Sequence, residues 1–173
     1  MTTPPAAPSA AELTALVEEA TKKSGLVWVN GQALWHAWVD GAMCVVGGSG
    51  EQPLPGLVDG GSARVSVRSR DKWGRLVSWD ARVRLLAPGD ERWVAAAVEL
   101  KGKRLNSPHG EGIVEWWAAE CQVFRLEPEG LPSEFPGAMS EASGAMAPVA
   151  TPATTRAAAP AGLPRLLARR RRV

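Results

Sequence analysis

The residues whose types and spacing could do chemistry lie between positions 33 and 70. A run with two tryptophans, Trp35-His36-Ala37-Trp38, precedes a small-residue loop, Gly47-Gly48-Ser49-Gly50, and a strand with arginines over residues 64–70. Indole rings can lie against a planar ring, and arginines can bind an anion. The loop continues into Glu51-Gln52-Pro53, however, which places a carboxylate where a phosphate would need a cation.

Metal binding and side-chain catalysis have little support in the sequence. Cys44 and Cys121 have no CxxC spacing and are accompanied only by His36 and His109. Each cysteine lies in an apolar run, so we expect two buried thiols and no metal site. No group of residues has the spacing of a nucleophile with its base, and we name no catalytic residue.

Composition and charge indicate one soluble domain with a separate tail. The 173-residue chain is long enough for one substantial core, contains no run that could span a membrane and lacks a signal-peptide pattern, so we expect a cytoplasmic protein. Residues 1–155 hold 14 Lys and Arg against 18 Asp and Glu, whereas residues 156–173 hold six Arg and no acid. The run Arg169 to Arg172 could attract nucleic acid weakly, but the body gives no reason to expect such binding.

Periodicity predicts a helix, a series of antiparallel strands and covering helices. Helical spacing follows a capping box at Ser9, and Asn30-Gly31 and Asp40-Gly41 are strong hairpin turns. The expected strands are 26–29, 33–39, 42–46, 64–70, 75–86 and 121–126, and the expected helices are 10–24, 91–101 and a short one near 116–119.

These elements predict a mainly β (α+β) domain, a six-stranded antiparallel split β-barrel with an N-terminal helix and one or two covering helices. We expect a flexible N-terminus over 1–8, the barrel domain over 9–130 and a disordered Ala/Pro/Arg-rich tail over 131–173.

Local segments resemble those of a known family. The runs that carry the resemblance are Trp35 to Gly41, Cys44 to Gln52, Leu57, and Arg64 to Arg68, with two later segments, Lys103 to Asn106 and Trp117 to Cys121. They are similar to those of split-barrel proteins related to pyridoxamine 5′-phosphate oxidase, including uncharacterised actinobacterial members. The resemblance implies a homodimer that binds flavin mononucleotide (FMN) or a deazaflavin at the subunit interface, with surface such as Trp28 or Trp117 buried between subunits.

The resemblance also implies which residues would hold the cofactor. Ser49 and the glycine amides of the loop would face the phosphate, Gln52 occupies the usual cation position, and Arg68 on the following strand could compensate for the missing cation. His36 and the neighbouring indoles would lie near the ring system. The full set of candidate cofactor-binding residues is Trp35, His36, Trp38, Ser49, Gln52 and Arg68.

Three functional hypotheses follow. The first is a flavin-binding or deazaflavin-binding split barrel, which as an enzyme would be an oxidoreductase on a small molecule, with the cofactor supplying the hydride chemistry. The second is a non-catalytic binding or structural module that has lost its cofactor, which Glu51-Gln52-Pro53 favours. The third and weakest is nucleic-acid association through the basic tail.

Overall fold

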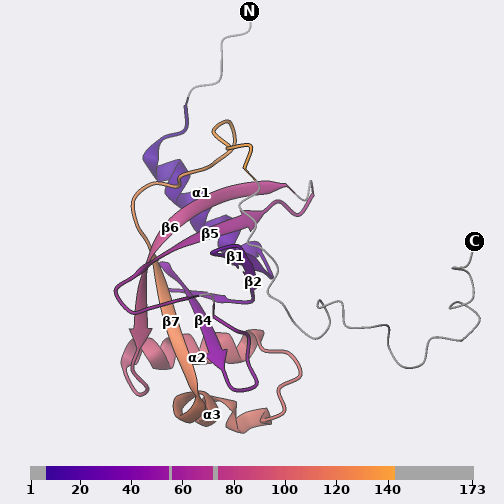
Figure 1. Cartoon of the computed structure of the whole chain (residues 1–173), viewed down its shortest axis with the longest axis vertical. Coiled ribbons are helices and arrows are strands. Elements are labelled where there is room, and N and C mark those ends of the chain that lie inside the picture. The colour runs from indigo at the N-terminus through magenta and orange to yellow at the C-terminus, as the bar shows by residue number, and fades with distance from the viewer. Residues whose placement is uncertain (1–6, 55, 72–73, 143–173) are drawn as a thin grey trace, which may run out of the picture.

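The computed structural model describes residues 7–54, 56–71 and 74–142 (Figure 1). The predicted arginine run 169–172 lies outside the described residues, as does the rest of the predicted tail beyond 142. In chain order the elements are α1 (Ala10–Lys23), β1 (Val27–Val29), β2 (Gln32–Leu34), β3 (Ala37–Val39), β4 (Ala42–Gly48), β5 (Ser62–Arg68), β6 (Arg75–Leu86), α2 (Glu91–Lys103), the 3-10 turn η1 (Gly110–Gly112), α3 (Ile113–Glu120) and β7 (Cys121–Pro128).

The first helix begins as the sequence predicts. The Glu12 amide donates to Ser9 Oγ over 3.3 Å, and the Ser9 amide donates back to the Glu12 carboxylate over 2.7 Å, which completes the capping box. Leu13, Val17 and Thr21 form the buried face of α1. This face covers the end of the barrel beside β6 (Figure 1).

Both predicted hairpin turns are confirmed. Asn30 and Gly31 have φ angles of 48° and 85°, and Asp40 and Gly41 have φ angles of 46° and 76°. Two consecutive residues with positive φ are typical of the turns whose twist matches that of paired strands. They join β1 to β2 and β3 to β4 in antiparallel pairs.

The strands form a single curled antiparallel sheet in the order β2-β1-β5-β6-β7-β4-β3. This arrangement confirms the predicted mainly β, barrel-like fold class, although the sheet has seven strands where we expected six. The predicted strand 33–39 is two strands, because Trp35 and His36 lead the chain from one edge of the sheet to the other. Two linking residues can span at most about 11 Å between Leu34 and Ala37, so the two edges face each other across a narrow seam.

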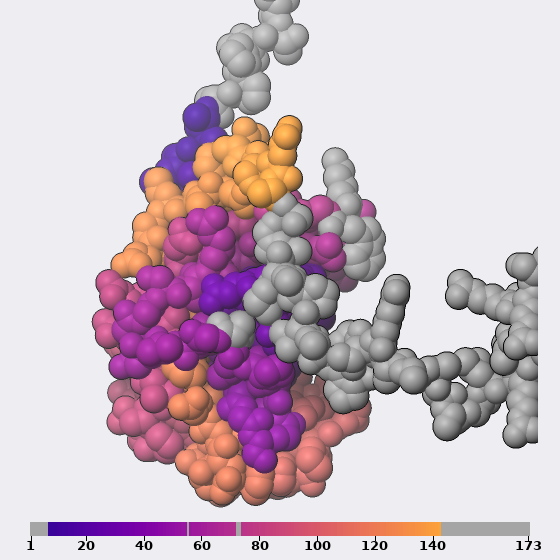
Figure 2. Space-filling model, in the orientation of Figure 1, coloured from indigo at the N-terminus to yellow at the C-terminus, as the bar shows by residue number. Residues whose placement is uncertain are grey.

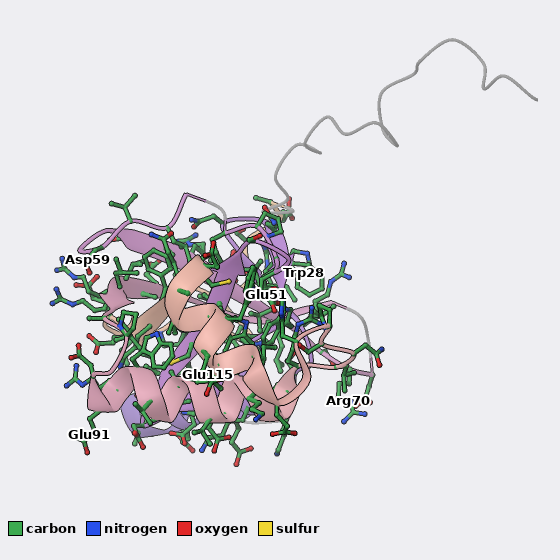
Figure 3. The ribbon with its side chains drawn as sticks, turned by 90° about the horizontal axis from the view of Figure 1, so that it is seen from below. Trp28, Glu51, Asp59, Arg70, Glu91 and Glu115 are labelled. Atoms are coloured by element: carbon green, nitrogen blue, oxygen red, sulfur yellow. The ribbon has the colours of Figure 1, made fainter. Side chains whose placement is uncertain are left out.

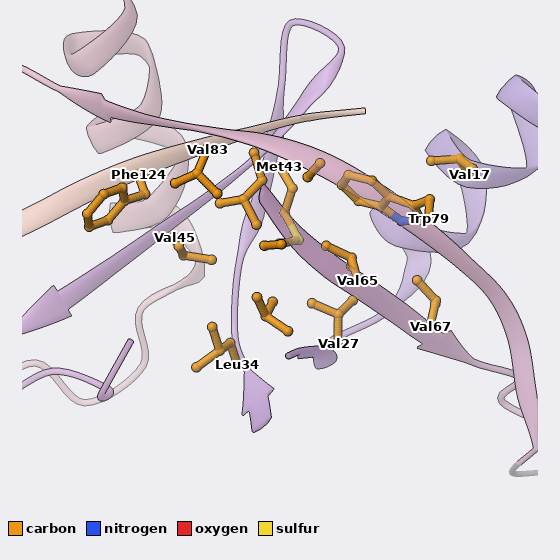
Figure 4. Packing of buried hydrophobic residues seen from close by; sticks show 14 of the residues in the cluster. Val17, Val27, Leu34, Met43, Val45, Val65, Val67, Trp79, Val83 and Phe124 are labelled. Carbon is orange, nitrogen blue, oxygen red and sulfur yellow. The ribbon is translucent and has the colours of Figure 1, made fainter. Parts of the chain in front are cut away.

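One strand is buried on both faces and separates two cores. On β4, Met43 and Val45 point into the barrel, whereas Cys44 and Val46 point to its outer face under α2 and α3. This double burial explains why β4 is a continuous apolar run rather than an alternating one. The barrel interior also contains side chains from α1 and from other strands, among them Val17, Val27, Leu34, Val65, Val67, Trp79, Val83 and Phe124 (Figure 4).

The outer core is closed by helices at the other end of the molecule (Figure 1). Trp93, Ala96 and Leu100 of α2 and Trp117 of α3 pack against β4 and β7. Helix α2 continues past Gly102, where we expected it to stop, and Asp90 precedes it without a capping bond from its side chain. Within the described ranges, no helix is long and apolar enough to cross a membrane.

The chain after β7 lies along the outside of β6. Ser78 and Glu134 form a backbone bridge, and the Glu134 carboxylate pairs with Arg75 over 3.1 Å. In the space-filling view this yellow-orange segment lies beside the indigo residues of α1 (Figure 2). Residues 131–142, which we placed in the tail, therefore contact the barrel.

We predict that Gly47→Ala destabilises the protein by about 1–3 kcal/mol. An added Cβ at Gly47 would lie 2.3 Å from Leu54 Cγ and 2.6 Å from the Gln52 carbonyl oxygen, so the loop after β4 would have to move. The control Gly102→Ala, with open space around the added carbon, should stabilise helix α2 by about 0.5–1 kcal/mol. Urea unfolding measures both changes, and equal stability of the two variants would contradict the close approach at Gly47.

Candidate functional site at the barrel seam

The loop after β4 folds back over the seam, and Gln52 in this loop forms hydrogen bonds to the backbone of the link between β2 and β3. The Trp35 amide donates to Gln52 Oε1 over 2.9 Å, and Gln52 Nε2 donates to the Trp35 carbonyl over 2.8 Å and to the Val46 carbonyl over 3.2 Å. A side-chain amide thus satisfies backbone groups at the link between the two edge strands, where the sheet itself offers no neighbour. The predicted phosphate contact at Gln52 is therefore replaced by a bond to the protein's own backbone.

The adjacent Glu51 carboxylate is directed into the protein. Its side chain is 3% exposed, and both its oxygens accept from Arg104 Nε, over 3.1 and 3.0 Å. Trp117 Nε1 donates to the same carboxylate over 3.0 Å. Figure 3 shows Glu51 near the centre of this end of the molecule, close to α3. A buried carboxylate needs such partners because its desolvation is costly.

A cavity of about 390 Å³ lies beside this contact. Its walls come from the link between β2 and β3, from the turn after α1 and from the end of α2. The lining residues are Ser24, Gly25, Leu26, Trp35, His36, Lys103, Arg104 and Leu105. The volume falls in the lower part of the range of about 300–1,000 Å³ that is usual for small-molecule sites. It combines aromatic and apolar surface with two cationic side chains.

His36 forms part of the buried wall of this cavity and is 5% exposed. Its Nε2 lies 2.9 Å from the Thr21 carbonyl, so Nε2 carries the proton and Nδ1 is left as an acceptor with no hydrogen bond from the described residues. Burial lowers the pKa of His36, and the charge of Lys103 lowers that pKa further, against the opposing effect of the Thr21 carbonyl. The imidazole is therefore neutral near pH 7.

The six predicted cofactor residues do not form one site. Trp35 and His36 line the cavity, and Gln52 lies behind them, bonded to Trp35. Trp38 lies instead near α1, edge-on to Trp79 with 6.1 Å between ring centroids. Arg68 lies over the Trp28 ring at 4.6 Å, away from the cavity lining.

Ser49 also differs from the expectation. It is an exposed residue whose carbonyl accepts from Trp116 Nε1 over 3.3 Å, which ties the loop to α3. Trp117, which we expected at a subunit interface, is 0% exposed within the single chain. It packs 6.4 Å from Trp35, between ring centroids, and cannot supply exposed surface to a partner.

We assigned no role to the cations of the site, although Lys103 and Arg104 belong to a segment that carries the family resemblance. We sought a cation within the loop near residue 52, but Lys103 and Arg104 come from the end of α2, some 50 positions later. Basic residues in the last turn of a helix are common because they interact favourably with its dipole, so their presence carried no specific signal.

Comparison with known proteins adds likeness of shape alone. No protein-family model matches the chain, and no curated protein matches it. The heme storage protein HutZ from Vibrio cholerae is similar with a TM-score of 0.45 and 10% identity, over 72% of this chain and 97% of that one. An FAD-binding protein from Mesorhizobium loti has a TM-score of 0.40 and 18% identity, over 72% of this chain and 93% of that one. At such scores these likenesses carry no argument about ligand or activity, which depends on the residues of the seam.

We predict that acid weakens the folded state through His36. Its folded-state pKa is lowered, so the unfolded chain binds the proton more readily, and the free energy of unfolding should fall as the pH drops below about 6.5. His36→Gln should flatten this dependence between pH 7.5 and 5.5, measured by urea unfolding, because the amide can still donate to Thr21. The control His109→Gln should keep the wild-type slope, and an unchanged slope in His36→Gln would exclude His36 as the cause.

Proposed function

We propose that the seam cavity binds a planar aromatic cofactor with an anionic end, of the flavin or deazaflavin class. The observation that carries this proposal is the lining itself, in which Trp35, His36 and Lys103 border one space of about 390 Å³. An indole and an imidazole offer flat surfaces to a ring, and Lys103 takes part in no ion pair among the described residues.

The chain's own residues fit such a ligand at the cavity but not at the loop. Trp35 and His36 would lie against the ring, and Lys103 would attract the anionic end. The loop that the family resemblance assigned to the phosphate is occupied by Glu51 and Gln52, both bonded within the protein. A bound flavin would supply hydride-transfer chemistry, and these side chains would position it and limit its contact with water.

A second candidate function rests on the loop. Because the side chains of Glu51 and Gln52 are hydrogen-bonded within the protein, the loop is held in place without a cofactor. A non-catalytic split-barrel module is the function that this observation favours. The two proposals differ in one measurable property, the binding of a flavin.

We predict that FMN and riboflavin quench the tryptophan fluorescence of the protein, with FMN bound somewhat more tightly. At low salt Lys103→Met should weaken FMN binding about two- to five-fold and leave riboflavin unchanged, because only FMN carries a phosphate for the ammonium to attract. The matched control Lys101→Met, also on α2, removes an ammonium that pairs with Glu111 of η1 and should change neither affinity.

Failure of both flavins and of a deazaflavin cofactor to bind or to raise the melting temperature would overturn the proposal in favour of the cofactor-free module. Binding of hemin without any flavin would overturn it as well, because it would assign the cavity to a different class of planar ligand.

We also propose a homodimer in which a second copy covers the mouth of the cavity. Support comes from Leu26 and Leu105, which line the cavity yet are 49% and 76% exposed. Leu105→Glu should shift the mass measured by light scattering from twice 18.3 kDa to the monomer value, because a buried carboxylate would oppose association. The control Leu131→Glu, at an exposed residue outside the cavity lining, should leave the mass unchanged, and a monomeric wild type would exclude the dimer.

A further inference from the structure

Of the two cations that line the seam cavity, only one is neutralised within the protein. Arg104 Nε contacts both oxygens of Glu51, and its Nη1 donates to the neighbouring Leu105 carbonyl. Lys103, the adjacent residue, has no carboxylate partner among the described residues. The cavity therefore contains two cationic groups but presents the charge of one.

The position of Glu51 is fixed by contacts with several parts of the fold. The Glu51 amide donates to the Gly48 carbonyl over 3.1 Å, which closes a turn, and the next residue, Gln52, is bonded across the seam. The carboxylate is held from a third direction by the Trp117 indole. Since it is almost fully buried and has three hydrogen bonds, it occupies a fixed place next to the cavity.

We infer that Glu51 sets the charge specificity of the seam cavity by acting as a built-in anion for Arg104. This role of Glu51 rests on the proposed binding of a flavin-class ligand to the cavity. With Glu51 in place, a phosphate meets only the Lys103 ammonium, because the guanidinium already has a carboxylate. The site is thereby suited to ligands whose anionic end is held weakly, by Lys103 alone, rather than to those that depend on a tightly held phosphate.

The physical basis is the strength of the bond that Glu51 pre-empts. Hydrogen bonds between a guanidinium and a phosphate are about twice as strong as neutral ones because both groups are charged. Here the Glu51 carboxylate already offsets the charge of Arg104 at 3.0 Å, which reduces the attraction that the guanidinium can offer to a phosphate. A phosphate that approached Arg104 here would also meet the Glu51 carboxylate at close range. Like charges at such a separation repel strongly in a partly buried site.

Substitution of the carboxylate by the neutral amide of the same size tests the inference. Glu51→Gln should tighten FMN binding about ten-fold and leave riboflavin within two-fold, because the released guanidinium can bind the phosphate. In addition, 20 mM sodium phosphate should raise the melting temperature of Glu51→Gln by at least about 2 °C over sodium chloride of equal ionic strength. The wild type should show no such difference.

Two variants serve as controls. Glu111→Gln removes one negative charge from an exposed residue and should leave the ratio of FMN to riboflavin affinity at the wild-type value. The double variant Glu51→Gln/Arg104→Gln removes both members of the pair and should lose the gain in FMN affinity and the response to phosphate. Far-UV circular dichroism establishes that each variant is folded.

The outcomes are distinguishable. A folded Glu51→Gln with the wild-type affinity ratio and no response to phosphate overturns the inference and leaves flavin binding standing. If no flavin binds the wild type or Glu51→Gln, the proposed function fails and the inference fails with it. If Glu51→Gln does not fold, the wild type decides, since a preference for FMN over riboflavin above about ten-fold would show that Arg104 already serves the phosphate.

Discussion

Residues 47–54 form the loop after β4 that folds back over the barrel seam, and the rest of this structure depends on the position of this loop. The curled sheet brings its two edge strands to either side of a two-residue link, and a link that short leaves peptide groups with no strand beside them. Gln52 supplies both the acceptor and the donor that the Trp35 peptide requires. Gly47 permits this return because any larger residue would meet Leu54 and the Gln52 carbonyl.

The position of this loop also requires hydrogen-bond donors from elements far away in the chain. Once Gln52 is placed, its neighbour Glu51 points inward, and a buried carboxylate is tolerable only with compensating donors. The C-terminal end of α2 provides Arg104, and α3 provides the Trp117 indole. The cavity walls, the charge of the cavity and the packing of both covering helices are therefore linked through one loop.

The sequence predicted much of the fold because its signals were local. The capping box at Ser9 and the turns at Asn30 and Asp40 each depend on a few neighbouring residues, and each was found where expected. The break of the strand 33–39 was missed because it depends on where the edges of the sheet meet. No short-range pattern distinguishes a continuous strand from two strands that belong to opposite edges.

The site was less predictable for a related reason. Trp35 and His36 were found because aromatic residues in a short run stand out, whereas Arg68 was assigned to a phosphate on its chemistry alone and instead lies over Trp28. The carboxylate at Glu51 was noticed as an obstacle to phosphate binding. Its partners lie 53 and 66 positions away, and only the closed fold shows that the obstacle is an internal ion pair.

The long reach of these bonds has a consequence for how the protein acquires its structure. The hairpins of the early strands can form from neighbouring residues, but the loop at Glu51 cannot be completed until the chain has been synthesised past Trp117 and both covering helices have packed. Contacts of such high sequence separation belong late in folding, because the cost of closing the chain precedes their benefit. The seam cavity is therefore a product of final assembly, and it forms together with the closed sheet, because β7, which joins β6 to β4, also follows Trp117 in the chain.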